Sequence, residues 1–474
     1  MRLSSYPSRN LHLDEQTLPA WIAILGLVLI SSLCVLAGAG GILRLGFPLL
    51  SLAVGLFLYL RYPVLYIGFT LWIWFLTPWL RRVVDSRSGW DPQGVMLLAP
   101  FLVTLVTFIT LVQHLPRACR QGGLPFILAL SGVFYAFFIG LILNPPLAAA
   151  RALLDWLTPI LFGFHLFVHW RDYPRFSQNI QRAFTWCVLI TGIYGVVQYL
   201  VAPEWDRFWI IKTELVTNGT PEPLGIRVFS TMNSPGPFAN VMIAGLLLLL
   251  NSRDPLRIPA SVVGYLVFLL SLVRSAWGGF LVGLFTLLAS LKARFQMRLI
   301  VIILVMAVCI IPLTAIEPFS EIISTRVESL YNIKDDVSFN ERSETYEQKL
   351  NIALSNGLGS GMGGIYSIND KGVLGVIVLD SGILDMFFTL GWFGAIPYVG
   401  GVTLLLLSLF QGNENRFDSF ASAARAISVS VFAQLMFGSV MLGLPGLMLW
   451  GFLGISMAAR RYYQYQHSVV LEKR

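Results

Sequence analysis

Long apolar segments without regularly spaced polar residues dominate the chain. Residues 21–40, 95–112 and 258–273 carry no charged side chain, and each approaches the roughly 20 residues that cross a hydrocarbon core about 30 Å thick. The strands of a membrane β-barrel would instead alternate apolar and polar residues over about 10 positions. Because these segments are apolar on every face, they indicate helices that span a membrane. The pattern predicts an all-α fold, a polytopic bundle of transmembrane helices.

The apolar segments predict about fourteen spans, or about twelve if the short pairs are re-entrant. We treat them as one integral membrane domain over residues 1–474. The expected spans lie near 21–40, 42–60, 64–80, 93–113, 125–143, 153–169, 183–201, 237–251, 258–273, 274–291, 299–315, 383–409, 423–438 and 440–458.

The distribution of charge sets the orientation of these spans. Only 12% of the residues are charged and 56% are hydrophobic, whereas an ordinary soluble domain is about 25% charged. The net charge of +8 comes from Lys and Arg residues scattered between apolar segments, so it indicates topology rather than a nucleic-acid partner. If basic loops stay cytoplasmic, one side holds the segments around Arg117, Arg171, Arg253, Lys292 and Arg460. Both termini are then cytoplasmic. Residues 202–237 form an extracytoplasmic loop, and residues 315–382 form a longer one with short helices.

Four arginines stand at the predicted outer face: Arg82, Arg227, Arg274 and Arg342. The planar guanidinium forms bidentate bonds and stays charged when partly dehydrated, which suits a diphosphate. The loop that contains Arg342 is acidic overall, so individual arginines would have to hold an anion. Plainer interpretations stay open, since Arg82 and Arg274 could reach lipid headgroups and Arg342 could pair with a neighbouring glutamate.

Asp380 stands at the start of a predicted span, between Leu379 and Ser381. An ionisable residue in such a place is costly and is by default a functional hypothesis. Its carboxylate could act as a general base toward a hydroxyl group, or it could cap the helix that follows. The two roles do not exclude each other.

The sequence predicts neither a cofactor nor a metal site. Residues 359–364 fit the spacing G-x-G-x-x-G, but a dinucleotide site also needs a strand before it and a helix after it. The predicted cytoplasmic loops are too short for a nucleotide-binding domain. His165 and His169 have a spacing that can bind metal. Asp172 is their sole nearby third ligand, and Trp170 beside them favours an interfacial position.

A spaced motif completes the set of candidate residues. Asp380 and Ser381 are followed by nine residues and then by Gly391-Trp392-Phe393-Gly394. This spacing resembles the O-antigen ligase and O-antigen polymerase family of bacterial envelope glycosyltransferases, whose ligases are known for His and Asn, Ser or Gln, nine residues, and Gly-x-x-Gly. Asp380 stands where those ligases have His, which favours a polymerase. The resemblance runs from about Arg227 to Gly394 and also includes segments 231–240, 271–278 and 357–364.

The resemblance implies a substrate and a mechanism. The family acts on glycans carried on undecaprenyl diphosphate at the outer face of the bacterial cytoplasmic membrane. It implies a metal-independent, inverting glycosyltransferase that polymerises lipid-linked oligosaccharide repeat units without a cofactor. Asp380 would be the base, with Arg274 and Arg342 as further catalytic residues, and Arg227, Arg274, Arg342 and Arg82 would bind the diphosphate. Chain-length regulators and flippases are the partner proteins that this implies.

Three alternatives to a polymerase stay open. The first is an O-antigen ligase that transfers the glycan to a terminal acceptor. The second is a transporter of a lipid-linked glycan or of a small anion such as inorganic carbon, because the family includes proteins once described in that way. Transporters place ionisable residues near the middle of the membrane, whereas here they gather at the outer ends of spans. The third is a scaffold subunit of an envelope assembly complex.

Overall fold

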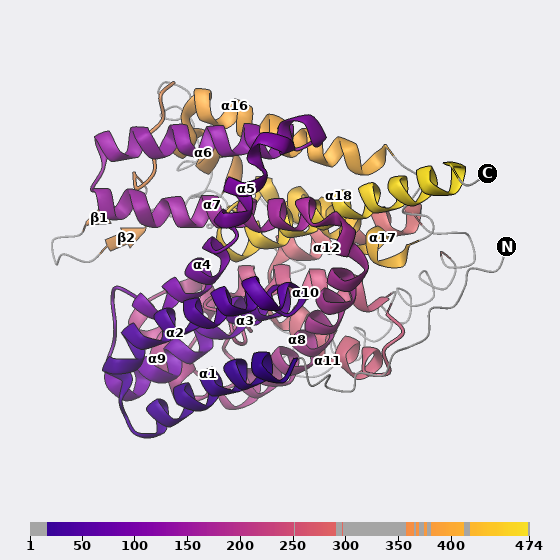
Figure 1. The fold of residues 1–474 in the computed structure, drawn as a ribbon. Helices are drawn as coiled ribbons and strands as arrows, with labels where there is room; N and C mark the ends of the chain where they lie inside the picture. Colours follow the sequence, from indigo (N-terminus) through magenta and orange to yellow (C-terminus); the bar gives the residue numbers. More distant parts are fainter. Residues whose placement is uncertain are drawn as a thin grey trace, which may run out of the picture.

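The computed structural model describes residues 17–250, 252–290, 296, 357–364, 366–368, 374–376, 381–411 and 418–472. Within these residues the chain is a bundle of α-helices with one small β-hairpin (Figure 1). Candidate residues Arg342 and Asp380 lie outside the described residues, as do the predicted span 299–315 and the helix expected in the long loop around Arg342.

The first half of the chain forms helices joined by short connections. In order they are α1 (Leu18–Leu36), α2 (Gly40–Arg61), α3 (Pro63–Ser88), α4 (Leu98–Leu105), α5 (Phe108–Ala118), α6 (Leu124–Leu143), α7 (Pro146–Val168), α8 (Tyr173–Val201) and α9 (Glu204–Thr213). Short 3-10 helices precede α4, follow α5, join α7 to α8 at Trp170–Asp172 and follow α9.

The second half has shorter helices first and longer ones last. They are α10 (Pro235–Leu250), α11 (Arg257–Leu270), α12 (Arg274–Ser290), α16 (Gly382–Phe410), α17 (Ser419–Ala433), the 3-10 helix η8 (Gln434–Met436) and α18 (Gly443–Glu472). Strands β1 (Tyr366–Ile368) and β2 (Leu374–Val376) pair antiparallel, with Ser367 opposite Gly375.

These helices confirm the predicted fold class. In the described part of the chain, nine helices are long and apolar enough to cross a membrane. Each predicted span other than 299–315 overlaps a described helix, although α10, α11 and α12 are shorter than a full crossing. The hairpin of β1 and β2 lies in the loop for which the sequence predicted short helices.

A buried aromatic cluster joins three of the long helices. Trp156 of α7, Tyr398 of α16 and Trp450 of α18 are fully or almost fully buried, and the Trp450 indole donates to the Tyr398 hydroxyl at 3.1 Å. Buried rings of this kind contribute large apolar areas, and their polar atoms find partners. The cluster fixes α16, whose first residue follows the candidate base, against the rest of the bundle.

The two predicted extracytoplasmic loops share one end of the bundle. Helix α9 belongs to the loop 202–237 and the β-hairpin to the loop 315–382, and both lie opposite the C-terminal end of α18 (Figure 1). The arrangement agrees with the alternation of spans from which the orientation was predicted. The side of the membrane that this end faces stays a prediction.

Candidate functional site

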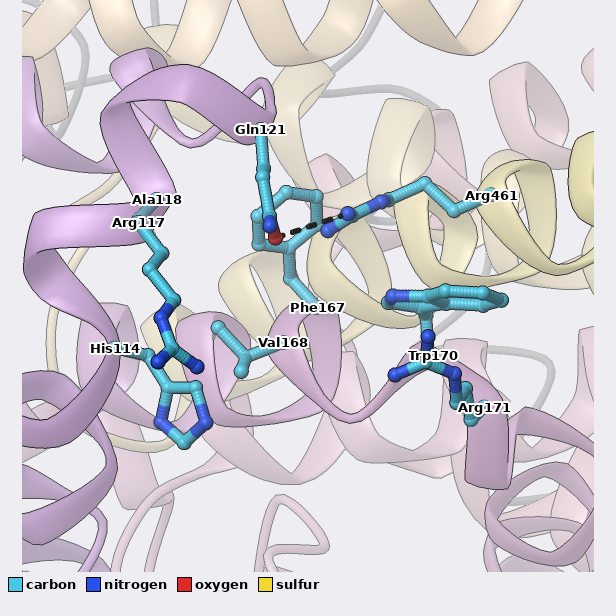
Figure 2. Close-up of a pocket in the computed structure, with 9 residues that line it drawn as sticks. All are labelled: His114, Arg117, Ala118, Gln121, Phe167, Val168, Trp170, Arg171 and Arg461. Carbon is cyan, nitrogen blue, oxygen red and sulfur yellow. Dashed lines mark hydrogen bonds between the residues drawn. The ribbon is translucent and has the colours of Figure 1, made fainter.

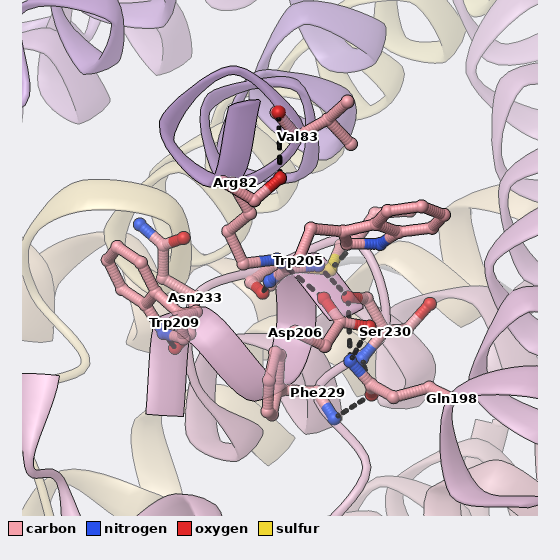
Figure 3. Close-up of polar contacts among 12 residues, drawn as sticks. Arg82, Val83, Gln198, Trp205, Asp206, Trp209, Phe229, Ser230 and Asn233 are labelled. Atoms are coloured by element: carbon pink, nitrogen blue, oxygen red, sulfur yellow. Dashed lines mark hydrogen bonds and ion pairs between the residues drawn. The ribbon is translucent and has the colours of Figure 1, made fainter. Parts of the chain in front are cut away.

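Arg82 of α3 holds the segment that leads into α10. Its guanidinium is fully buried and forms an ion pair with Asp206 of α9, with 2.9 Å between Nε and Oδ1. Its two terminal nitrogens donate to the backbone carbonyls of Ser230 and Met232, and the group lies over the Phe229 ring (Figure 3). Arg82 therefore binds backbone and a carboxylate within the protein.

Gln198 of α8 completes this network. Its side-chain oxygen accepts from the backbone N–H groups of Phe229 and Ser230 at 3.0 and 2.7 Å, and its nitrogen donates to Asp206 at 2.9 Å. Ser230 has a φ of 49°, a conformation that costs free energy in a residue with a side chain. The ion pair balances the two buried charges, and Arg82 and Gln198 bind backbone carbonyl and N–H groups of the strained segment, so the segment is held in one conformation.

Arg227 connects the same segment to the turn between α11 and α12. Its Nε donates to the carbonyl of Ser271 at 3.3 Å and its Nη2 to the carbonyl of Leu272 at 2.8 Å. The neighbouring N–H of Val228 donates to Leu270 at 3.1 Å. Arg274 is the first residue of α12, so the structure brings two of the predicted diphosphate ligands to one turn. Both side chains are half-buried.

The start of α16 lies close to the first turns of α12. Gly382 packs against Leu435 and the carbonyl of Gly438. The adjacent residue Gln434 donates to Asn240 of α10 at 2.9 Å and lies against Gly279 of α12. Helix η8 thus bridges the beginning of α16 and the helix that Arg274 opens. Asp380 immediately precedes the buried residue Ser381 at this junction.

Asp385, one turn into α16, has a structural contact. Its Oδ2 accepts from the Ser439 hydroxyl at 2.6 Å and its Oδ1 from the Thr389 hydroxyl at 3.2 Å. The side chain is buried. These bonds fix the connection between η8 and α18 against the beginning of α16.

The glycine pair of the spaced motif shapes α16. Gly391 interrupts the helix with a φ of 61° and a ψ of −179°, and a Cβ there would lie 2.4 Å from the carbonyl oxygen of Leu358. The N–H of Trp392 donates to the carbonyl of Gly357 at 2.9 Å. A Cβ on Gly394 would lie 3.0 Å from the carbonyl of Gly132 in α6. The motif therefore lets the chain from residue 357 dock onto a kinked helix.

The glycine-rich segment 357–364 packs between helices. The N–H of Ser360 donates to Phe388 of α16 at 2.8 Å, and the N–H of Met362 donates to Ala136 of α6 at 2.9 Å. The amide of Asn144, at the end of α6, donates to the carbonyls of Ser360 and Met362. The backbone donors that a phosphate-binding loop would offer to a ligand here bind helix carbonyls.

Sequence reasoning missed the partners of the predicted arginines. Asp206 and Gln198 are a loop carboxylate and a polar residue in a predicted span, and nothing in their local pattern sets them apart. Within the described residues, buried polar atoms without a hydrogen-bond partner include the Oδ1 of Asn233 and the indole Nε1 of Trp277. Asn233 lies in segment 231–240 and Trp277 in segment 271–278, two of the segments in which the chain resembles the family. That resemblance was the signal by which the sequence could have indicated them.

The side chains of His165 and His169 pack against neighbouring side chains and against each other. Nδ1 of His165 lies 2.7 Å from the hydroxyl of Thr110, and its ring lies next to that of His169 with centroids 4.4 Å apart. Among the described residues, no group of three His, Cys, Asp or Glu side chains could hold a metal ion.

Comparison with known protein families gives a match in the second half of the chain. Residues 259–399 match the family model described as O-antigen ligase. This range runs from α11 to the kinked part of α16 and includes Arg274, Arg342, Asp380 and the glycine pair. The comparison with curated proteins found no match. The match confirms the resemblance to the O-antigen ligase and polymerase family over residues 259–399, and it supports a glycan-processing function at a membrane.

Proposed function

We propose that this protein polymerises undecaprenyl-diphosphate-linked oligosaccharide repeat units at the outer face of the bacterial cytoplasmic membrane. The observation that carries the proposal is the contact of Arg227 with the turn that precedes Arg274. It gathers two half-buried arginines at the first turn of a helix within the region that matches the O-antigen ligase family. A helix N-terminus and guanidinium groups together favour a diphosphate.

The lengths of the surrounding helices support a recessed site. Helices α10, α11 and α12 have 16, 14 and 17 residues, which correspond to about 21–26 Å at 1.5 Å per residue. The hydrocarbon core is about 30 Å thick. The turn between α10 and α11 carries Arg253 and Asp254, and Arg257 is the first residue of α11; we expect these charged residues at a membrane surface. The opposite ends, with Arg227 and Arg274, would then stop short of the outer surface.

Such a depth suits a lipid-linked donor. Irregular backbone is tolerated at membrane depth where it is buried in protein or lines a water-filled cavity. The carbonyls of Ser271 and Leu272 are satisfied by Arg227, which keeps this turn compatible with that depth. A diphosphate attached to a polyprenyl chain could reach the recess from the bilayer while its lipid tail stays in hydrocarbon.

Arg82 takes a different part in this proposal from that predicted from the sequence. Its guanidinium is fully buried and binds Asp206 and two backbone carbonyls. We therefore propose that Arg82 is a positioning residue, which holds the segment after Arg227 rather than touching the diphosphate. Arg227, Arg274 and Arg342 remain the proposed diphosphate ligands.

The proposed reaction is a single displacement. The carboxylate of Asp380 takes the proton of an acceptor hydroxyl, whose oxygen forms a bond to the anomeric carbon of the donor. The bond from that carbon to the diphosphate oxygen breaks, and the lipid diphosphate leaves with its electron pair. Arginines near the leaving group would stabilise the developing negative charge. One displacement inverts the anomeric centre, and because the diphosphate bond supplies the free energy, no cofactor is required.

The decisive experiment uses purified protein in detergent with lipid-linked repeat units from the native host. Products of the wild type, Asp380→Asn and Arg274→Ala are compared by gel electrophoresis of the glycan. Arg257→Ala is the matched control, because Arg257 begins α11 at the end opposite the Arg274 turn. A ladder that requires Asp380 and Arg274, but not Arg257, would support a polymerase.

A ligase is the second candidate, because the matching family is described as O-antigen ligase. It predicts a single transfer product with a terminal acceptor, and no ladder. If the wild type transfers nothing from a verified native substrate, the glycosyltransferase proposal is wrong, and transport or scaffolding must be tested. Chain-length regulators and flippases would act with a polymerase as partner proteins, and co-purification with them is the direct test.

A further inference from the structure

A positively charged pocket lies where α5, α7 and α18 meet. Nine residues line it: His114, Arg117, Ala118, Gln121, Phe167, Val168, Trp170, Arg171 and Arg461 (Figure 2). Three of them are arginines, and none of the nine is acidic. The pocket gathers three of the basic segments that the sequence assigned to the cytoplasmic side.

This pocket is separate from the proposed active site. It adjoins the beginning of α8, since Trp170 and Arg171 lie in the 3-10 helix just before that helix. Helix α8 has 29 residues and is therefore about 44 Å long. Asp206, which pairs with Arg82, lies in α9, directly after the far end of α8 in the chain. The pocket thus lies at the opposite end of the bundle.

Aromatic rings hold two of the arginines in place. The indole of Trp170 lies between the guanidinium groups of Arg171 and Arg461, which are 4.7 and 5.4 Å from the ring centroid (Figure 2). Arg461 also lies over Phe167 at 4.9 Å and donates to the side-chain oxygen of Gln121 at 3.3 Å. Such contacts orient guanidinium groups and leave their positive charge in place.

The charge of the cluster is not balanced by the lining residues. Arg461 lies beyond the predicted last span, and burial together with the nearby charge of Arg171 lowers the pKa of its guanidinium. The carboxylate nearest in sequence belongs to Asp172, which does not line the pocket. It lies 3.9 Å from the guanidinium of Arg175, which is also outside the pocket. Bringing guanidinium groups together in this way costs free energy, which a bound anion would offset.

We propose that this pocket binds the phosphate of an anionic lipid headgroup in the membrane leaflet that faces the C-terminal end of α18. Basic pockets between transmembrane helices on the cytoplasmic side are suited to such headgroups. Tryptophan is enriched at the level of the headgroups, and Trp170 is one of the residues that line the pocket. The planar guanidinium groups of Arg171 and Arg461 match the oxygens of a phosphate.

The test counts lipids on the full-length protein. Wild type, Arg171→Gln, Arg461→Gln and the double variant are purified in detergent, stripped of lipid and titrated with phosphatidylglycerol, and the bound lipid is counted by native mass spectrometry. Arg257→Gln is the control, because Arg257 lies at the same end of the bundle but does not line the pocket. Phosphatidylcholine and inorganic phosphate are titrated in parallel.

We expect each single variant to bind phosphatidylglycerol about fivefold more weakly, and the double variant about 25-fold, from the usual contribution of an arginine near anionic lipid. The control should bind like the wild type, and phosphatidylcholine should show no dependence on the arginines. Arg171 is exposed, so its variant should fold normally. Equal phosphatidylglycerol binding by all variants would overturn the proposal. Displacement of the lipid by millimolar inorganic phosphate would show a site for free phosphate instead.

Discussion

Replacing Gly391 with alanine tests how the motif positions the loop that carries two predicted catalytic residues. The backbone there has a φ of 61° and a ψ of −179°, a region nearly restricted to glycine that costs other residues about 1–3 kcal/mol. The new Cβ would lie 2.4 Å from the carbonyl carbon and oxygen of Leu358. Overpacking of this kind costs about 1–3 kcal/mol, so we expect a total loss of about 2–6 kcal/mol.

The structure indicates where that cost is relieved. Helix α16 is fixed by the buried cluster around Tyr398, whereas the segment 357–364 reaches it through a few backbone bonds. The segment should therefore move away, which breaks the bond between the N–H of Trp392 and the carbonyl of Gly357. Because this segment lies between Arg342 and Asp380 in the chain, we expect transfer activity to fall while the protein remains in the membrane.

Gly400→Ala is the matched control in the same helix. A Cβ on Gly400 meets no heavy atom within 4 Å, and alanine favours helix over glycine by about 1 kcal/mol. The assays are glycan transfer, and hydrogen exchange of the peptide that contains residues 357–364. We expect faster exchange and lower activity in Gly391→Ala, and wild-type behaviour in Gly400→Ala. Wild-type exchange and activity in Gly391→Ala would refute the proposed role of the kink.

Three further predictions follow from described contacts. Asp206→Asn leaves the buried Arg82 without its counter-charge, so we expect the folded protein to lose about 3–5 kcal/mol of stability. The loss should appear as a lower melting temperature in detergent. An unchanged melting temperature would contradict the importance of the ion pair. Arg227→Lys keeps the positive charge but loses the two bonds to the α11–α12 turn. We expect the rate of glycan transfer to fall at least tenfold while the melting temperature stays normal. Full activity would mean that a positive charge at this position is enough for transfer. Val216, which is 91% exposed in the loop 202–237, should when changed to cysteine react with a membrane-impermeant thiol reagent on intact spheroplasts. The native Cys119, exposed beyond α5, should react after lysis, and the reverse order would overturn the predicted orientation.

The sequence predicted the helices well because membrane spans follow from local composition. A run of apolar residues has one stable state in a bilayer, since its backbone must satisfy its own hydrogen bonds. Helix α6 therefore lies where its apolar segment predicted it, and α7 and α8 end within one residue of their predicted ends. Both begin earlier than predicted, α7 at Pro146 and α8 at Tyr173, because their first turns contain polar residues. The break between α4 and α5 was not predicted, because Val106 and Thr107 interrupt the helix without a glycine or proline.

Pairing between distant residues could not be predicted in the same way. Arg227 and Arg274 were each predicted as diphosphate ligands, but the contact of Arg227 with the turn before Arg274 depends on how α11 and α12 pack. Arg82 looked like another exposed cation. Its partner Asp206 lies in a predicted loop, but in the folded protein its side chain is fully buried. A single sequence contains no pattern that predicts this burial.

The difference between Arg82 and Arg274 indicates where we expect the substrate to bind. The guanidinium of Arg82 is fully buried, and it binds Asp206 and backbone oxygens within the protein. Arg274 is half-buried at the first turn of a short helix, where its charge adds to the positive end of the helix dipole. A guanidinium at a helix N-terminus is an arrangement that favours a bound anion. We therefore expect the diphosphate of the substrate at the turn of Arg274 rather than at the network of Arg82.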